Sequence, residues 1–306
     1  MTARPPRLRY PRVPARSAIF ILALLILLPG CLILSAPPRR SDQLPPISTQ
    51  ATNTWQPGRF VWLELITPDA AAARKFYGTL LGWTFKQLPE QPEYTEIFNR
   101  QRRIGGIIEL KPENRQKVAA QWLGTLSVAN LDTALALVKE RGGKILNGPV
   151  AMSQRGAGAL VSDPQGANLV LLRAKEGDPP EHQPGIGDWL WVEDWTTELA
   201  PAVQFYKELG GYQKALTENG YAILINQNKW RAGIRQIQDA AFSRRWVPAV
   251  RVENAAPLAE RAAALGGRIW IKPGQSPANP DTALISDDAG ALLILQPWDF
   301  SGEEKP

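Results

Sequence analysis

Apolar and polar positions recur along residues 60–110 with the periods of strands and helices. The segment 60–66, FVWLELI, is mostly apolar and predicts a strand. A helix follows, opened by residues 67–69 and closed at Gly82. Its apolar residues recur at steps of three and four, so one face packs on a sheet. Two more strands are expected near 94–99 and 104–110.

The same order of elements starts again at residue 122. The pattern predicts a strand over 122–128 and then a helix over 131–141 that ends at Gly142-Gly143. Three further strands are expected near 145–150, 157–162 and 168–173. Each unit is therefore interpreted as strand, helix, strand, strand, strand, and two units make one domain.

The whole domain is present twice. FVWLELITPDAAAARKFYGTLLGW (60–83) aligns without gaps with WLWVEDWTTELAPAVQFYKELGGY (189–212). Two later pairs of segments also match: 122–130 with 246–254, and 163–172 with 287–296. An internal repeat of this length indicates two homologous domains of similar fold.

A nineteen-residue uncharged segment, Ala18 to Ala36, follows five arginines near the N-terminus. A basic start followed by an apolar run is typical of an export signal. Cys31 comes after Leu28-Pro29-Gly30, which resembles the bacterial motif whose cysteine is lipidated. The alternatives are an uncleaved signal-anchor, with its arginines on the cytoplasmic side, and a cleaved signal. We expect a membrane-anchored chain with its domains on the extracytoplasmic, periplasmic side of the cell envelope.

Charge is concentrated in that N-terminal region. The chain has 35 Lys plus Arg and 29 Asp plus Glu, a formal charge of +6. Residues 1–40 contain seven arginines and no acidic residue, so the remainder is close to neutral. No nucleic-acid partner is expected from such a distribution. One cysteine and one histidine also exclude a disulfide within the chain and any site that needs two histidines.

These observations divide the chain into six segments. The divisions rest on the repeat, on the apolar N-terminal run and on two stretches rich in proline and glycine. The expected segments are 1–35, signal peptide or membrane anchor; 36–57, Pro-rich linker; 58–174, domain 1; 175–186, linker; 187–299, domain 2; and 300–306, C-terminal tail.

Four segments resemble a known superfamily. FYGTLLGW, FYKELGGY, KERGGKI and SDPQGANLVLL are similar to sequences of the vicinal oxygen chelate superfamily, which includes glyoxalases, bleomycin resistance proteins and ring-cleaving dioxygenases. The resemblance implies an α+β fold with four βαβββ units forming two tandem glyoxalase-like open-barrel domains, an internal pseudo-dimer. In the metal enzymes of the superfamily, four inward side chains hold a divalent ion that chelates vicinal oxygens of the substrate.

The resemblance also indicates where those four metal ligands would fall. In each domain one position is polar and three are apolar or aromatic. The positions are Trp62, Glu109, Leu123 and Val170 in domain 1, and Trp191, Gln236, Val247 and Ile294 in domain 2. A single carboxylate binds a divalent ion weakly, so no metal cofactor is expected, and a divalent metal remains the lesser alternative.

The expected barrels offer aromatic and acidic side chains instead. Trp62 and Glu64 are two residues apart on one strand, so they project to the same side, as do Trp191 and Glu193. An indole beside a carboxylate predicts a pocket for a flat or cationic small molecule; packing alone is the alternative. The candidate ligand-binding residues are Trp62, Glu64, Trp122, Trp191, Glu193, Gln236 and Trp246, and Glu109 is a weak candidate for a general base.

Three function classes follow. The first is an exported, membrane-tethered glyoxalase-like protein that has lost the family metal site and binds a small molecule or an envelope partner. The second is a glyoxalase-, dioxygenase- or lyase-type enzyme that uses a displaced metal or an acid-base carboxylate. The third is a structural protein that presents a surface to an envelope partner. Whether the chain is an enzyme stays open at this point.

Overall fold

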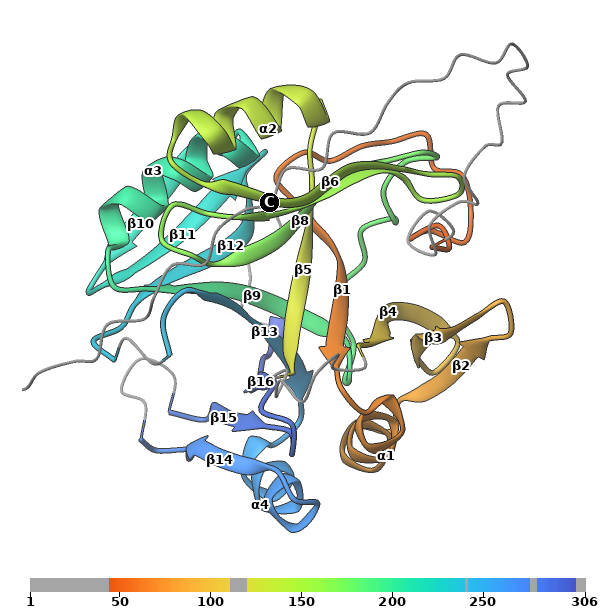
Figure 1. Cartoon of the computed structure of the whole chain (residues 1–306). Helices are drawn as coiled ribbons and strands as arrows, with labels where there is room; N and C mark the ends of the chain where they lie inside the picture. Colours follow the sequence, from red (N-terminus) through yellow and green to blue (C-terminus); the bar gives the residue numbers. More distant parts are fainter. Residues whose placement is uncertain (1–43, 111–119, 240–241, 276–279, 301–306) are drawn as a thin grey trace, which may run out of the picture. The chain divides into compact units, whose positions relative to one another are not determined.

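A computed structural model describes residues 44–110, 120–239, 242–275 and 280–300 (Figure 1). The chain divides into two compact units, residues 1–37 and 38–306, and the described residues belong to the second. The predicted signal segment with Cys31 lies outside the described residues. Within the described part of the chain, no helix has the length and apolar character needed to cross a membrane.

Domain 1 is an eight-stranded mixed sheet with two helices. Its strands follow the order β2-β3-β4-β1-β5-β8-β7-β6, with β1 parallel to β4 and β5 parallel to β8. The elements are β1 Phe60–Thr67, α1 Ala70–Leu81, β2 Thr84–Leu88, β3 Gln91–Asn99, β4 Arg102–Glu109, β5 Gln121–Ser127, α2 Leu131–Glu140, β6 Lys144–Met152, β7 Gly156–Ser162 and β8 Asn168–Ala174.

Domain 2 repeats this topology strand for strand, in the order β10-β11-β12-β9-β13-β16-β15-β14. The expected α+β fold with two tandem glyoxalase-like domains is confirmed. The elements are β9 Trp189–Thr196, α3 Leu199–Gly210, β10 Lys214–Glu218, β11 Tyr221–Asn226, β12 Lys229–Gln236, β13 Arg245–Val252, α4 Ala255–Ala264, β14 Arg268–Ile271, β15 Ala283–Ser286 and β16 Leu292–Pro297.

The predicted helix boundaries are explained by their caps. Asp69 accepts a hydrogen bond from the backbone N–H of Ala72 at the start of α1, and Gly82 ends the helix in the left-handed conformation. The position of one strand of this unit was not predicted. The sequence of β2, TFKQL, is mostly exposed and polar, so it lacks the apolar alternation that marks its neighbours.

Each sheet has two faces of different character. On β1, Leu63 and Leu65 face the helices, and we call this side the helix face. Trp62 and Glu64 point to the other side, the inner face, because successive side chains alternate. The helix faces of both domains contribute to one continuous hydrophobic core, whereas each inner face has a smaller cluster of its own.

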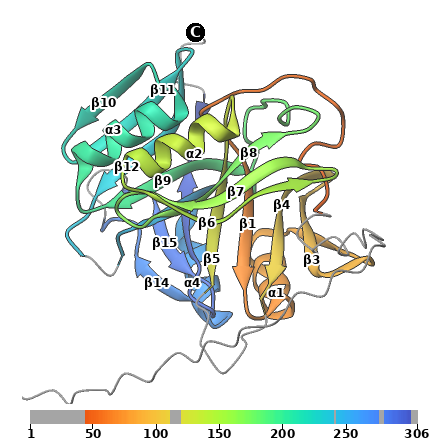
Figure 2. The same ribbon diagram turned by 45° about the horizontal axis from the view of Figure 1, so that its top comes forward.

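Two buried tyrosines connect the domains through that shared core. The hydroxyl of Tyr77 on α1 donates to the Asp287 carboxylate, 3.0 Å away in the turn between β15 and β16. In the same way, Tyr206 on α3 donates to Asp163, 2.8 Å away in the turn between β7 and β8. Helices of opposite domains also pack together, α1 with α4 and α2 with α3 (Figure 2). The first helix of each domain is therefore bound to the last turn of the other.

The two aspartates also hold their own turns. One carboxylate oxygen of Asp163 accepts from the backbone N–H groups of Gln165, Gly166 and Ala167, at 2.7–2.9 Å. Asp287 makes equivalent bonds to the backbone of its own turn. The repeated segments that resemble the superfamily, FY in the helices and DPQG or DDAG in the turns, thus encode how the domains associate.

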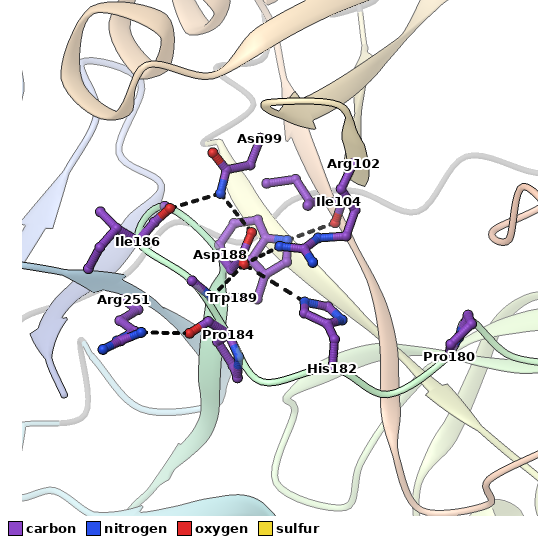
Figure 3. Close-up of polar contacts among 12 residues, drawn as sticks. Asn99, Arg102, Ile104, Pro180, His182, Pro184, Ile186, Asp188, Trp189 and Arg251 are labelled. Carbon is purple, nitrogen blue, oxygen red and sulfur yellow. Dashed lines mark hydrogen bonds and ion pairs between the residues drawn. The ribbon is translucent and has the colours of Figure 1, made fainter. Parts of the chain in front are cut away.

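The linker between the domains is fastened to domain 1 (Figure 3). Asp188 forms an ion pair with Arg102 and accepts a 2.7 Å hydrogen bond from Asn99. Asn99 also donates to the backbone oxygen of Ile186 at 2.9 Å. His182, the single histidine, lies 3.8 Å from the Asp188 carboxylate, and its side chain is 40% exposed. The linker and the β3–β4 turn therefore form one polar junction.

Asp194 on β9 is a buried carboxyl group in the shared core. It is fully buried, and neither of its oxygens has a hydrogen-bond partner among the described residues. Burial, and then the nearby Asp163 carboxylate, raise the pKa of Asp194 well above its ordinary value of 3.8. In domain 1 the equivalent position is Leu65, since Leu65 lies opposite Trp122 as Asp194 lies opposite Trp246.

Replacing Asp194 by the residue of domain 1 tests this assignment. We expect Asp194→Leu to raise the free energy of unfolding by about 1–3 kcal/mol near pH 7, because it removes an unsatisfied buried polar group. A group with a raised folded-state pKa stabilises the fold below its unfolded-state pKa, and this contribution is lost as the pH rises. The advantage of Asp194→Leu over the wild type should therefore widen from about pH 4 to about pH 7 in urea unfolding.

Asp194→Asn serves as the control, because it keeps the shape and removes only the titration. Its stability relative to the wild type should show the same trend with pH. A leucine variant that is less stable than the wild type at every pH would contradict the assignment.

Candidate functional site

One buried glutamate stands at the same place on each inner face. Glu64 lies opposite Gly106 on β4, and Glu193 lies opposite Gly233 on β12. The two residues are 4% and 3% exposed. A carboxylate removed from water needs a charged or hydrogen-bonding partner to remain in the fold.

In domain 1 the partners of Glu64 are Arg155 and Tyr94. The Arg155 guanidinium donates to Glu64 at 2.7 Å, and the Tyr94 hydroxyl donates to it at 3.0 Å. Arg155 also donates to the Tyr94 oxygen at 3.0 Å, which closes a triangle. Burial lowers the pKa of Arg155, but the Glu64 charge, the Tyr94 hydroxyl and the hydrogen bonds to both together outweigh it, so that pKa lies above its ordinary value. Burial raises the pKa of Tyr94, which keeps the phenol protonated.

In domain 2 the partners of Glu193 engage both of its oxygens. Arg235 donates two hydrogen bonds, one to each carboxylate oxygen, at 2.7 and 2.9 Å. Tyr221 and Trp195 donate to the same carboxylate at 2.9 and 3.0 Å. The Trp191 indole then donates to the Tyr221 oxygen at 2.8 Å. Such bidentate pairing with arginine is among the stronger charge-assisted interactions in proteins.

The two domains supply the arginine from different elements. Arg235 belongs to β12, where it lies opposite Tyr221. The corresponding position on β4 is Ile108, opposite Tyr94, and domain 1 instead uses Arg155 from the turn between β6 and β7. The same Glu–Tyr–Arg triad has therefore been assembled in two ways.

A tyrosine and a glycine occupy matching positions in both triads. A Cβ on Gly106 would lie 2.3 Å from the Tyr94 hydroxyl oxygen, and one on Gly233 would lie 2.1 Å from that of Tyr221. Only glycine leaves room for the ring to reach the glutamate. The sequence prediction missed both tyrosines, although their spacing to these glycines is the same in the two copies.

These residues do not fit a divalent metal ion. In domain 2 both oxygens of Glu193 already accept hydrogen bonds, and the Arg235 cation stands where an ion would approach. In domain 1 the Arg155 cation pairs with one oxygen of Glu64 at 2.7 Å and would likewise oppose a second cation. Among the described residues, no group of three His, Cys, Asp or Glu side chains is placed to hold a metal.

The predicted residues Glu109 and Gln236 do not join the triads. Ile107 belongs to the helix-face core, so by alternation the inner-face residue at this end of β4 is Ile108 and not Glu109. Gln236 is exposed and donates to the backbone oxygen of Thr197 at 3.1 Å. A shift of one residue in the expected position put both side chains on the wrong face.

Trp122 and Trp246, predicted among the ligand-binding residues, do not lie on the inner faces. Trp122 lies opposite Leu65, on the helix face, and its indole donates to Tyr77 at 3.2 Å. Trp246 donates to Tyr206 at 3.0 Å in the same way. Of the predicted ligand-binding residues, Trp62 with Glu64 and Trp191 with Glu193 are brought together on the inner faces.

Residues 45–47, which precede β1, cover the inner face of domain 1. Arg155 donates to the backbone oxygen of Pro45 at 2.8 Å, and Arg103 donates to that of Pro46. Ile47, 3% exposed, packs in one cluster with Trp62. The described part of the predicted 36–57 linker thus packs on domain 1 and does not act there as a free spacer.

The inner face of domain 2 is more accessible. The Arg235 side chain is 25% exposed, whereas that of Arg155 is 4% exposed. Trp191 and Trp270 are half-buried, and Phe242 makes an edge-to-face contact with Trp270 at a centroid distance of 4.8 Å. This face therefore offers partly exposed aromatic rings beside a fixed ion pair.

Comparisons with known proteins agree with the fold. Residues 59–97 match the family described as bleomycin resistance protein-like N-terminal. A putative glyoxylase of Mycobacterium tuberculosis, CFP32, is 24% identical over 244 residues, which cover 77% of this chain and 94% of the relative. The anthracycline biosynthesis protein DauV of a Streptomyces species is 24% identical over 260 residues, covering 78% and 94%.

Solved structures show the same two-domain architecture. The Mn(II)-bound glyoxalase of Novosphingobium aromaticivorans superposes with a TM-score of 0.54 at 12% identity, covering 78% of this chain and 82% of that one. The 2,3-dioxygenase LapB of Pseudomonas sp. KL28 gives 0.53 at 12% identity, covering 84% and 97%. The chain is thus a protein of two tandem glyoxalase-like domains. These comparisons together support a relationship to the vicinal oxygen chelate superfamily.

Removing the arginine of the first triad tests its structural role. We expect Arg155→Met to lower the free energy of unfolding by about 3–5 kcal/mol, because Glu64 would remain buried without its cation. Arg141, whose side chain is 49% exposed and 2.7 Å from Glu208, provides the matched control. Arg141→Met should cost less than about 1 kcal/mol in the same urea titration. Equal losses in the two variants would contradict the role of Arg155.

Proposed function

We propose that the chain is a metal-independent binding protein whose domain 2 takes up a flat aromatic small molecule on its inner face. The observation that carries this proposal is the contrast between the two inner faces. Ile47 and the residues before it cover the triad of domain 1, while the aromatic rings around Glu193 in domain 2 remain partly exposed. A concave, mostly apolar face with a few fixed polar groups is the usual form of a small-molecule site.

The chemistry of this face favours a planar ligand. The half-buried indoles of Trp191 and Trp270 can contact a flat ring system by stacking or by edge-to-face packing. The Arg235 guanidinium lies 4.6 Å from the centroid of the Tyr221 ring and is held by Glu193. A polar substituent of the ligand would meet a guanidinium that is already oriented, which reduces the entropy cost of binding.

The relatives support this choice of ligand class. DauV is named as an anthracycline biosynthesis protein, and anthracyclines contain a flat fused-ring system. The match of residues 59–97 is to a bleomycin resistance protein-like family. An enzyme of glyoxalase or dioxygenase type is the alternative. It would need a metal or a free carboxylate base, and Glu193 is occupied by Arg235, Tyr221 and Trp195.

Ligand titration of the full chain tests the proposal. We expect an anthracycline, or another fused-ring compound of a planar panel, to bind saturably and to quench tryptophan fluorescence. Trp191→Ala should weaken this binding at least ~10-fold, because it removes one wall of the face. Trp62→Ala is the matched control, since Trp62 is buried beneath Ile47 in domain 1, and its affinity should be unchanged.

The same preparation separates binding from metal-dependent catalysis. Absence of saturable binding across the panel, or an equal loss in Trp62→Ala, would contradict the proposal. Stoichiometric iron, manganese, zinc or nickel that remains after dialysis would favour the enzyme alternative. The proposal expects the metal content to stay well below one ion per chain.

We further propose that the N-terminal segment tethers both domains to the membrane on the extracytoplasmic side. The uncharged run from Ala18 to Ala36, the arginines before it and Cys31 support this proposal. If Cys31 carries a lipid, Cys31→Ser should abolish incorporation of a labelled fatty acid and leave the chain unprocessed. Unchanged labelling or processing would contradict lipid anchoring and leave an uncleaved signal-anchor, which protease protection of spheroplasts would detect.

A further inference from the structure

A pocket of about 250 Å³ lies at the boundary between the two domains. It opens where β5 and β13 begin, and these two strands contact each other at the centre of Figure 1. Both domains contribute to its walls, and no residue of either inner-face triad lines it. The described residues that line it are Ala120, Gln121, Trp122, Asn168, Arg244, Arg245, Trp246, Gly290 and Leu292.

The pocket is built where the repeat brings its two copies together. Residues 120–122 of domain 1 and residues 244–246 of domain 2 are equivalent, since WLGTLSVAN and WVPAVRVEN align from Trp122 and Trp246. Both triplets line the same pocket. A site at this boundary exists only because the two domains are associated.

The two copies have diverged at this place in a chemically specific way. Arg245 stands where domain 1 has Gln121, and Arg244 stands where it has Ala120. Asn168 of domain 1 likewise corresponds to Leu292 of domain 2. Domain 2 therefore supplies two cations, and domain 1 supplies two neutral amides.

The polar groups of the pocket are suited to an oxyanion. Guanidinium groups and side-chain amides all present N–H donors, and arginine matches the geometry of carboxylate and phosphate oxygens. None of the described lining residues is acidic. Burial lowers the pKa of Arg245, because its cation is partly removed from water.

Two buried tryptophans form part of the remaining wall, and the backbone of Arg244 is fixed from outside the pocket. Trp122 and Trp246 are each 4% exposed and are held by hydrogen bonds in the shared core. The backbone N–H of Arg244 donates to the Trp195 oxygen at 2.7 Å. The side chain of Arg244 passes over Gly166, where a Cβ would lie 3.4 Å from its Cδ atom.

We propose that this boundary pocket binds the carboxylate or phosphate group of a small organic anion, with Arg244 and Arg245 as the cationic partners. Gln121 and Asn168 supply amide donors, and Trp122 and Trp246 supply an apolar wall. Because both domains contact the ligand, its binding also stabilises their association.

Calorimetric titration of the full chain with sodium benzoate and, separately, with inorganic phosphate tests this site. Saturable binding of at least one anion is expected. The double variant Arg244→Gln/Arg245→Gln should weaken it at least ~10-fold. Arg100→Gln is the matched control, because Arg100 is also an exposed arginine with a left-handed backbone (φ 56° against 65° for Arg244) and lies away from the pocket. Its affinity should equal that of the wild type.

Gln121→Glu provides a second variant that removes no arginine. Its carboxylate would pair with the arginines and compete with the ligand, so binding should be lost while the thermal midpoint stays the same or rises. Trp191→Ala, on the inner face of domain 2, should leave anion affinity unchanged, which separates this site from the proposed aromatic ligand site. Absence of saturable binding of both anions, or affinity unchanged in the double variant and in Gln121→Glu, would overturn the proposal.

Discussion

Two buried hydrogen bonds between tyrosine and aspartate hold the domains together, and the placement of every site depends on them. Tyr77 and Tyr206 lie on the first helix of each domain and reach Asp287 and Asp163 in the other. The helix faces are consequently buried in one common core. The inner faces lie outside this core. The repeated segments of the sequence therefore describe how the domains associate more directly than they describe a site.

The inner faces are governed by the cost of burying a carboxylate. Glu64 and Glu193 are almost completely removed from water, and each is compensated by an arginine and a tyrosine. This compensation places an arginine cation against each carboxylate, which disfavours a divalent ion there, so the chemistry of metal-binding relatives cannot be transferred to these faces by fold alone. The arginine comes from a turn in domain 1 and from a strand in domain 2, which shows that the charge balance matters more than the element supplying it.

The two copies of the domain have diverged in accessibility and in charge. In domain 1 the residues around Ile47 close the inner face, while the corresponding face of domain 2 keeps partly exposed aromatic rings. At the boundary, domain 2 contributes Arg244 and Arg245 where domain 1 has Ala120 and Gln121. Duplication thus supplied two similar scaffolds, and later substitutions made one closed face, one open face and one cationic pocket between them.

Local patterns in the sequence determined the four βαβββ units and the pairing of tryptophan with glutamate on one strand face, because alternation along a strand is a local property. Strand β2 escaped prediction because its exposed residues carry no such alternation. Only the tertiary structure showed that Trp122 faces the helices, since its orientation depends on its register with β1. The pairing of Arg155 with Glu64 also emerged only from the tertiary structure, because side-chain contacts between residues distant in the chain depend on how the sheet closes. No local pattern of residues contains that information.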